Sequence, residues 1–172
     1  MDNASKFTEK GLRIKSITVS FIISFNSIFS INKDVKINFT PSNRHQSSLF
    51  VYADKNRIQQ VIFNLLDNAS KFTEKGEITI SIIVEEKDGN NKDNNNNNIT
   101  IKIQDTGKGI DSEILPRLFK KFATKSEKGT GLGLYISKNI VEAHNGKIWI
   151  EKTSNGKGTV FVFTLPTRNN SK

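Results

Sequence analysis

Four polar residues recur at helical spacing between positions 60 and 71, and their side chains could hold a phosphorylated ligand. At 100° per residue, Gln60, Asn64, Asn68 and Lys71 fall within a narrow sector of one helix. A solvated face has the same spacing, but such faces usually carry Lys, Glu and Arg, because Asn is a poor helix former. An amide oxygen can bind Mg²⁺, and a nearby lysine can meet phosphate. The stripe therefore indicates either a solvated face or a metal and phosphate site.

Two glycine-rich segments follow further along the chain. In "DTGKGI" (105–110), Asp105 at a strand end could accept a hydrogen bond from an exocyclic amine such as that of adenine. The segment "GTGLGL" (129–134) opens a helix, and such turns present backbone N–H groups to phosphate. It has neither the "GK[ST]" ending of a Walker loop nor the preceding strand of a dinucleotide fingerprint. Each segment taken alone is only suggestive, since many turns look similar.

The helix that carries the polar stripe is the clearest element in the sequence. Asp54 stands at its N-cap position, and Gly76 is expected to stop it. Its apolar stripe consists of Ile58, Val61, Ile62, Leu65, Leu66, Ala69 and Phe72.

Alternating or apolar segments predict strands around this helix. They lie at 35–39, 49–53, 77–86, 99–105, 146–151 and 158–166, with a second helix over about 132–143. Connections of hairpin length imply antiparallel pairing, with the helices packed on one face. We therefore expect an α+β fold, a two-layer α/β sandwich with a mixed, mostly antiparallel sheet. The Asn-rich run 87–98 predicts a disordered hairpin tip.

Composition narrows the functional classes. The chain has 172 residues and no cysteine, which excludes disulfides and thiolate metal sites. Its formal charge of +9 suits an anionic small molecule, an acidic protein or nucleic acid, or simply a lysine-rich solvated surface. No arginine-rich helix, zinc spacing or aromatic-basic strand supports nucleic acid. The apolar stretch 14–31 is short and serine-rich for a membrane helix, and no small-residue cleavage pattern follows it clearly, so an ordinary buried or aberrant segment is favoured over a membrane or export role.

Several motifs stand in a fixed order along the chain. "QVIFNLLDNASKFT" is followed by "DTGKGI", then "LPRLFKKF", then "GTGLGLYISKNIVEAHNGKIWIE" and finally "GKGTVFVFTLP". In this order they resemble the N box, first glycine box, F box, second glycine box and last strand of the ATP-binding catalytic domain of sensor histidine kinases. The resemblance assigns this domain to residues 32–168, leaving a degenerate or truncated segment at 1–31 and a tail at 169–172. It implies the fold shared by histidine kinases, gyrase-type topoisomerases and related ATPases.

The resemblance also implies roles for individual residues. Asn64, Asn68 and Lys71 match catalytic positions, the two asparagines toward Mg²⁺ and the lysine toward phosphate. Phe72 matches a ring beside the adenine, and Asp105 matches the carboxylate that reads the base. The other implied ATP-binding residues are Gly107, Gly109, Ile110, Phe119, Phe122, Gly129, Thr130, Gly131, Leu132, Gly133 and Leu134. A lid over about 111–128 is expected to close over the triphosphate.

One substitution within the resemblance bears on mechanism. Asn64 stands where ATPases of this superfamily carry a glutamate that serves as general base, and an amide cannot take a proton from water. The resemblance therefore implies a cytoplasmic domain that holds ATP and Mg²⁺ and transfers the γ-phosphate. The implied partners are the histidine-containing dimerisation domain of another kinase chain and a response regulator receiver domain, with no nucleic acid.

No segment resembles the phosphoacceptor hairpin of complete kinases. His45 lies in a polar loop, and His144 is expected at a helix end, facing solvent or the helix dipole. We therefore expect a protein-histidine kinase domain that is not self-sufficient; the alternatives are an anti-sigma-type serine kinase and a non-enzymatic ATP-binding module. The word "DNASKFTEKG" occurs at 2–11 and again at 67–76. Only the second copy has N-box surroundings, so the first is expected to be a relic.

Overall fold

The structure is a computed structural model of the chain. It describes residues 12–13, 34–40, 50–51, 53–85, 98–124, 129–151, 153 and 157–167. The apolar stretch 14–31, the first copy of the repeated word, His45 and most of the Asn-rich tip lie outside these residues, as do lid residues 125–128. Asn98, which the sequence places in that tip, already pairs with Glu85 and Pro166.

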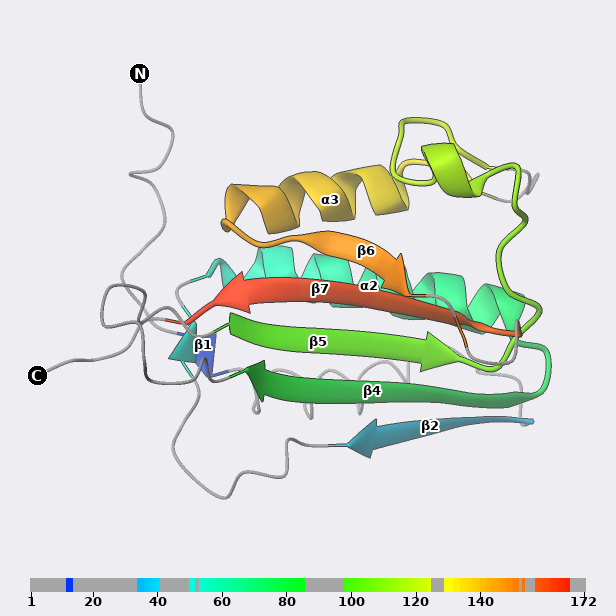
Figure 1. Ribbon diagram of the computed structural model, residues 1–172, viewed down its shortest axis with the longest axis horizontal. Coiled ribbons are helices and arrows are strands. Elements are labelled where there is room, and N and C mark those ends of the chain that lie inside the picture. Colours follow the sequence, from blue (N-terminus) through cyan, green and yellow to red (C-terminus); the bar gives the residue numbers. More distant parts are fainter. Residues whose placement is uncertain are drawn as a thin grey trace, which may run out of the picture.

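Five strands form the main sheet in the order β2-β4-β5-β7-β6 (Figure 1). Their bounds are Val35–Thr40 (β2), Gly76–Glu85 (β4), Asn98–Asp105 (β5), Ile148–Glu151 (β6) and Thr159–Pro166 (β7). Neighbouring strands are antiparallel except β2 and β4, which are parallel. This parallel pair agrees with the predicted mixed, mostly antiparallel sheet, because a helix lies between the two strands in sequence and returns the chain to the same end of the sheet.

The strand predicted at 49–53 does not join the main sheet. Its described part, β3 (Phe50–Val51), pairs with β1 (Leu12–Arg13) in a separate antiparallel ladder. Val51 also forms an isolated bridge with Thr167, just beyond β7.

The helix α2 (Lys55–Phe72) carries the predicted polar and apolar stripes. The Asp54 carboxylate caps it by accepting hydrogen bonds from the backbone N–H groups of Asn56 and Arg57, at 2.9 and 3.1 Å. Six of the seven apolar residues are buried, but Phe72 is 37% exposed because it is the last helical residue and lies beyond the core. Thr73 is already extended, so Gly76 starts β4 and does not terminate α2 as the sequence predicts.

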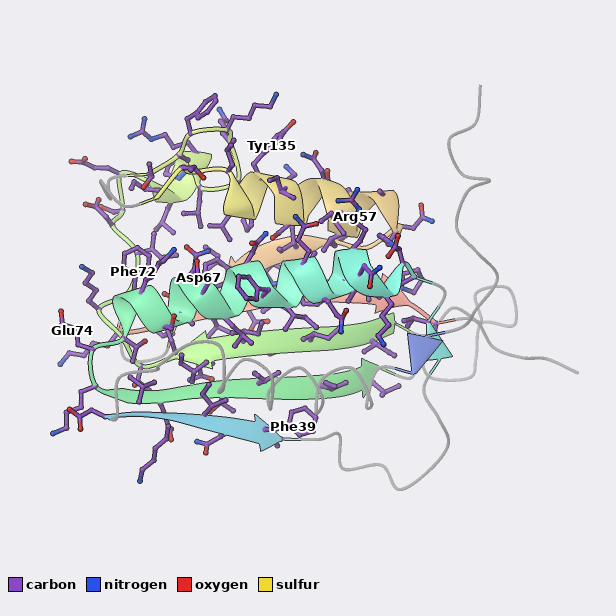
Figure 2. The ribbon with its side chains drawn as sticks, turned by 180° about the vertical axis from the view of Figure 1, so that it is seen from behind. Phe39, Arg57, Asp67, Phe72, Glu74 and Tyr135 are labelled. Atoms are coloured by element: carbon purple, nitrogen blue, oxygen red, sulfur yellow. The ribbon has the colours of Figure 1, made fainter. Side chains whose placement is uncertain are left out.

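The second helix, α3 (Gly133–Ala143), packs beside α2 on the same face of the sheet, as Figure 2 shows. This arrangement confirms the predicted two-layer α+β fold. Between the layers lies one apolar core to which α2, α3, β4, β5 and β7 all contribute. Among the described residues, no helix is both long and apolar enough to cross a bilayer.

His144 follows α3, where the sequence predicts that it faces solvent or the helix dipole. The residue is buried, so the solvent-facing alternative is wrong. Its Nε2 accepts the backbone N–H of Asp54 at 3.0 Å, and its Nδ1 lies 2.7 Å from the carbonyl oxygen of Ile140. Since Nε2 is an acceptor, Nδ1 carries the hydrogen and donates to that carbonyl. The imidazole thereby joins the end of α3 to the N-cap of α2.

The N-cap leads to a first prediction. Replacing Asp54 with alanine removes the acceptor for two helix N–H groups and should lower the free energy of unfolding by about 1 kcal/mol. Urea denaturation followed by circular dichroism measures this change. Asp54→Asn is the matched control, since its amide oxygen can still cap the helix. Equal losses in the two variants would contradict a capping role.

Candidate functional site

One end of the sandwich gathers the predicted site segments. There α2 and β5 end, and β7 and α3 begin, on the right-hand side of Figure 1. The fold thus brings the end of α2 to the same end of the molecule as the two glycine-rich segments. These segments begin about 40 and 65 residues after Asn64 in the chain.

Asp105, the last residue of β5, is only 2% exposed. Its Oδ1 accepts hydrogen bonds from the backbone N–H groups of Gly107 at 2.9 Å and Thr159 at 3.2 Å. Burial raises the pKa of the Asp105 carboxyl above its ordinary value. The hydrogen bonds from Gly107 and from the hydroxyl and N–H of Thr159 act in the opposite direction. A buried acid is therefore held in one orientation by several donors.

Gly158 and Thr159 belong to this site, although the sequence assigns them only to the last strand. The Gly158 N–H donates to the Gly107 carbonyl at 2.8 Å. Gly158 has φ +76°, and a Cβ there would lie 2.1 Å from the carbonyl oxygen of Asp105. Only glycine allows so close a passage of the two backbones. The glycine directly before the strand was the sequence signal that could have identified this contact.

The first glycine box also packs on the end of α2. The Lys108 N–H donates to the Phe72 carbonyl at 3.3 Å, and the Lys108 ammonium lies 5.4 Å from the centre of the Phe72 ring. Beside this contact, Thr73 is buried, and its hydroxyl has no hydrogen-bond partner among the described residues. The predicted adenine-side residues Phe72 and Asp105 are thus joined through one backbone turn.

The side-chain nitrogens of the two asparagines of α2 both donate hydrogen bonds. Asn68 Nδ2 donates to the carbonyl oxygen of Asn64 at 2.7 Å. Asn64 Nδ2 donates at 3.2 Å to both the Gly133 carbonyl and the Ser137 hydroxyl. Within the described part of the chain, neither Oδ1 accepts a hydrogen bond, so both remain available to a ligand. Ser137 is absent from the sequence prediction, because nothing in the sequence pairs it with Asn64.

Lys71 does not point to an open site in this structure. Its ammonium forms an ion pair with the Asp67 carboxylate, one helical turn earlier, at 2.6 Å. The lysine side chain is about half exposed, and such surface pairs contribute about 0–1 kcal/mol. A phosphate group could therefore compete with Asp67 for this ammonium.

The backbone of the F box lies against the backbone of the second glycine box. Gly131 has φ +67°, and a Cβ there would lie 2.7 Å from the carbonyl carbon of Phe122. Phe122 itself has φ +61° and a ring that is 71% exposed, whereas the Phe119 side chain packs against the core.

The remaining predicted residues lie in or beside the two glycine-rich segments. Ile110 packs against the core, Leu134 is buried within α3, and Thr130 is exposed. Gly109 approaches Gly158, Leu132 is the N-cap of α3, and Gly129 lies ahead of it.

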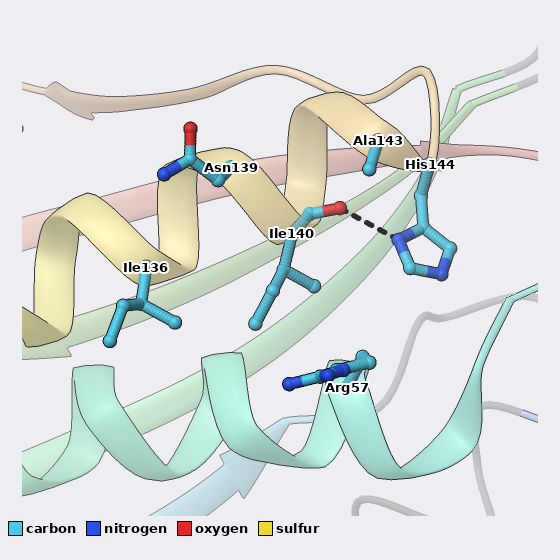
Figure 3. Close-up of a pocket in the computed structure, with 6 residues that line it drawn as sticks. All are labelled: Arg57, Ile136, Asn139, Ile140, Ala143 and His144. Carbon is cyan, nitrogen blue, oxygen red and sulfur yellow. Dashed lines mark hydrogen bonds between the residues drawn. The ribbon is translucent and has the colours of Figure 1, made fainter. Parts of the chain in front are cut away.

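A separate hollow of about 240 Å³ lies at the other end of the helix pair (Figure 3). Its lining is mainly apolar and consists of Arg57, Ile136, Asn139, Ile140, Ala143 and His144. None of these belongs to the predicted site, and we assign the hollow no function.

The donor set of the site suits a hard cation that keeps much of its water. No three His, Cys, Asp or Glu side chains of the described residues cluster as metal ligands. Mg²⁺ typically needs only one or two protein oxygens when phosphates supply the others. The amide oxygens of Asn64 and Asn68 meet that requirement.

Comparison with known proteins agrees with this reading of the fold. Residues 53–169 match the family described as histidine kinase-, DNA gyrase B- and HSP90-like ATPases. The chain is 36% identical to the sensor protein KdpD of Clostridium acetobutylicum over 96% of this chain and 17% of that protein. It is 34% identical to the sensor histidine kinase WalK of Bacillus subtilis over 94% and 26%.

A solved structure extends the comparison. The catalytic domain of the histidine kinase ThkA superposes with a TM-score of 0.71 at 30% identity, covering 91% of this chain and 96% of that domain. The fold and the family match together show that the chain belongs to the histidine kinase-type ATPase family, as a catalytic domain of the kind found in two-component sensor kinases. It spans less than a third of the two curated relatives.

The buried carboxyl leads to a second prediction, about stability without a ligand. The unfolded carboxyl titrates near its ordinary value of about 3.9, and the folded one titrates at higher pH. Ionising Asp105 therefore destabilises the fold as the pH rises through that interval. Asp105→Asn should unfold at the same or a higher urea concentration than wild type at pH 7, and this difference should shrink toward pH 4. The prediction is contradicted if the stability of Asp105→Asn falls relative to that of wild type as the pH rises from 4 to 7.

Proposed function

We propose that this domain binds ATP with Mg²⁺ and transfers the γ-phosphate to a histidine on another domain or chain. The observation that carries the proposal is the buried Asp105 carboxylate, held in one orientation at the end of the fold where α2 ends and α3 begins. A buried acceptor that is already oriented suits an exocyclic amine of the base, because binding then requires no further reorganisation of the site.

The base would lie between the first glycine box and the end of α2. Asp105 accepts from its amine, and Phe72 offers a ring face that is partly exposed. The turn from Asp105 to Gly107 is fixed by its contacts with Phe72 and Gly158, so this part of the site is formed before any ligand arrives. Binding of the base would therefore require side chains to move at this place, but not the backbone.

The triphosphate would extend from the base toward the start of α3. There Asn64 and Asn68 would hold Mg²⁺ through their Oδ1 atoms, and Lys71 would exchange Asp67 for a phosphate oxygen. When bound, Mg²⁺ would supply positive charge that stabilises the phosphoryl group during transfer. The segment 129–133 supplies backbone N–H groups to the phosphates.

Transfer is favoured over hydrolysis because an amide, that of Asn64, stands at the position where the related ATPases carry their general base. Asn64 cannot accept a proton from water, and its amide nitrogen donates to Gly133 and Ser137. Catalysis then depends on positioning and electrostatics, with the nucleophile supplied by the acceptor histidine. His144 does not serve as that acceptor, because both of its ring nitrogens are engaged inside the fold.

The same proposal includes the partner domains and the cellular compartment of the reaction. The acceptor is a histidine-containing dimerisation domain, and the phosphoryl group passes from it to a receiver domain of a response regulator, in the cytoplasm where ATP is abundant. The family membership and the likeness to a histidine kinase catalytic domain support these partners.

A third prediction tests binding and transfer together. Isothermal titration with the non-hydrolysable analogue AMPPNP and Mg²⁺ should show binding to wild type. Asp105→Asn should weaken it by about 10- to 100-fold, the effect of losing a charge-assisted hydrogen bond. Incubation with radiolabelled ATP and a separately purified histidine hairpin should then place acid-labile label on the hairpin.

The controls separate the alternatives. A hairpin whose histidine is replaced by glutamine should stay unlabelled. Acid-stable label on a partner protein would favour a serine kinase, and nucleotide binding without transfer to any hairpin would favour a non-enzymatic module. Absence of heat with wild type at high protein concentration would refute nucleotide binding itself.

A further inference from the structure

Ser137 is a polar residue inside an apolar helix contact. It lies one turn into α3 and is fully buried. Leu134, Ile140 and Val141 of the same helix join α2 in the hydrophobic core. Alanine would fit the same space and is a better helix former than serine. The hydroxyl therefore needs an explanation other than packing.

The hydroxyl takes part in a closed set of three hydrogen bonds. Ser137 Oγ donates to the Gly133 carbonyl at 2.9 Å and accepts from Asn64 Nδ2 at 3.2 Å, while Nδ2 also donates to the Gly133 carbonyl at 3.2 Å. The two acceptors lie only 2.9 Å apart, so they share one side of the amide nitrogen. This arrangement fixes the rotation of the Asn64 amide, with its nitrogen on α3.

An amide fixed in this way presents its oxygen and not its nitrogen to a ligand. A cation accepts only the oxygen, and a flipped amide would place two partly positive hydrogens where the oxygen had been. Without Ser137, the Gly133 carbonyl alone would hold Nδ2, which is a weaker constraint on rotation. Asn68 does not need such help, because its own helix carbonyl holds its nitrogen.

We infer that Ser137 is a positioning residue for the divalent cation: its hydroxyl keeps the Asn64 oxygen directed to the metal position. The inference rests on the proposed function, since it concerns the Mg²⁺ that accompanies the nucleotide. Because the partner atoms belong to the first turn of α3, the same contact ties the metal side of α2 to the segment that follows the second glycine box.

The test compares AMPPNP affinity with Mg²⁺ and with EDTA, using the full chain. In wild type, Mg²⁺ should increase the affinity. In Ser137→Ala this increase should fall by about three- to tenfold, the effect of losing one hydrogen bond, while the affinity in EDTA stays within about twofold of wild type. An unchanged increase in Ser137→Ala would overturn the inference, and so would an equal loss with and without the metal.

Two further variants separate positioning from general damage. Ser70→Ala is the matched control, because Ser70 Oγ donates to the Asp67 carbonyl on α2 and does not touch Asn64. It should leave the Mg²⁺-dependent increase intact. In an Asn64→Ala background, Ser137→Ala should have no additional effect on that increase, since the hydroxyl acts only through the amide. An additive loss would refute this route.

A measurement without nucleotide or metal completes the test. The side-chain amide hydrogens of Asn64 should exchange with water faster in Ser137→Ala than in wild type, as observed by NMR. Ser137→Thr retains the hydroxyl and should restore slow exchange; if the extra methyl disturbs the fold, Ser137→Cys with its weak S–H donor should give an intermediate rate. Equal exchange in wild type and Ser137→Ala would contradict the inference. Failure of wild type to bind AMPPNP under any condition would instead refute the proposed function.

Discussion

The site depends on a carboxylate placed inside the fold. Asp105 ends β5 at a point where the helices and the sheet leave little access to water, and an unpaired charge there would destabilise the protein. Backbone donors on two separate segments compensate for that burial, so the turn at Gly107 and the start of β7 at Thr159 are fixed relative to each other. Gly158 is the position at which this proximity excludes every other residue. The result is a rigid acceptor in a fold whose remaining stability comes from an ordinary apolar core.

The helix pair has a polar connection at each end. At the site end, Asn64 donates to the first turn of α3. At the far end, His144 accepts the N–H of Asp54, which also caps α2. Between them the contact is apolar. We interpret the two polar connections, each between defined atoms, as fixing the alignment of the two helices along their axes, which in turn sets where the second glycine box begins.

Local sequence rules predicted the elements well, and long-range contacts less so. The N-cap and apolar stripe of α2 depend on neighbours within a few residues, and both were confirmed. Three other features depend on contacts between residues that are distant in sequence: the parallel pairing of β2 with β4, the burial of His144, and the contact between Ser137 and Asn64. A local sequence pattern does not identify the partner in such a contact. The motif order predicted the fold and family, and both were confirmed, whereas the ligand contacts of its residues stay predictions. Thr159 was missed because the first residue of a strand gives no sign in its own sequence position of a contact with a distant carboxylate.

The central claim is that Asp105 reads the base as an acceptor for an exocyclic amine. The most direct measurement compares AMPPNP with its inosine counterpart, which carries a carbonyl in place of that amine, by competition titration in the presence of Mg²⁺. Two facing acceptors repel each other, so the inosine analogue should bind wild type at least about tenfold more weakly. In Asp105→Asn the preference should largely disappear, because an amide can turn its NH₂ toward the carbonyl. Equal affinities of the two analogues for wild type would contradict the account.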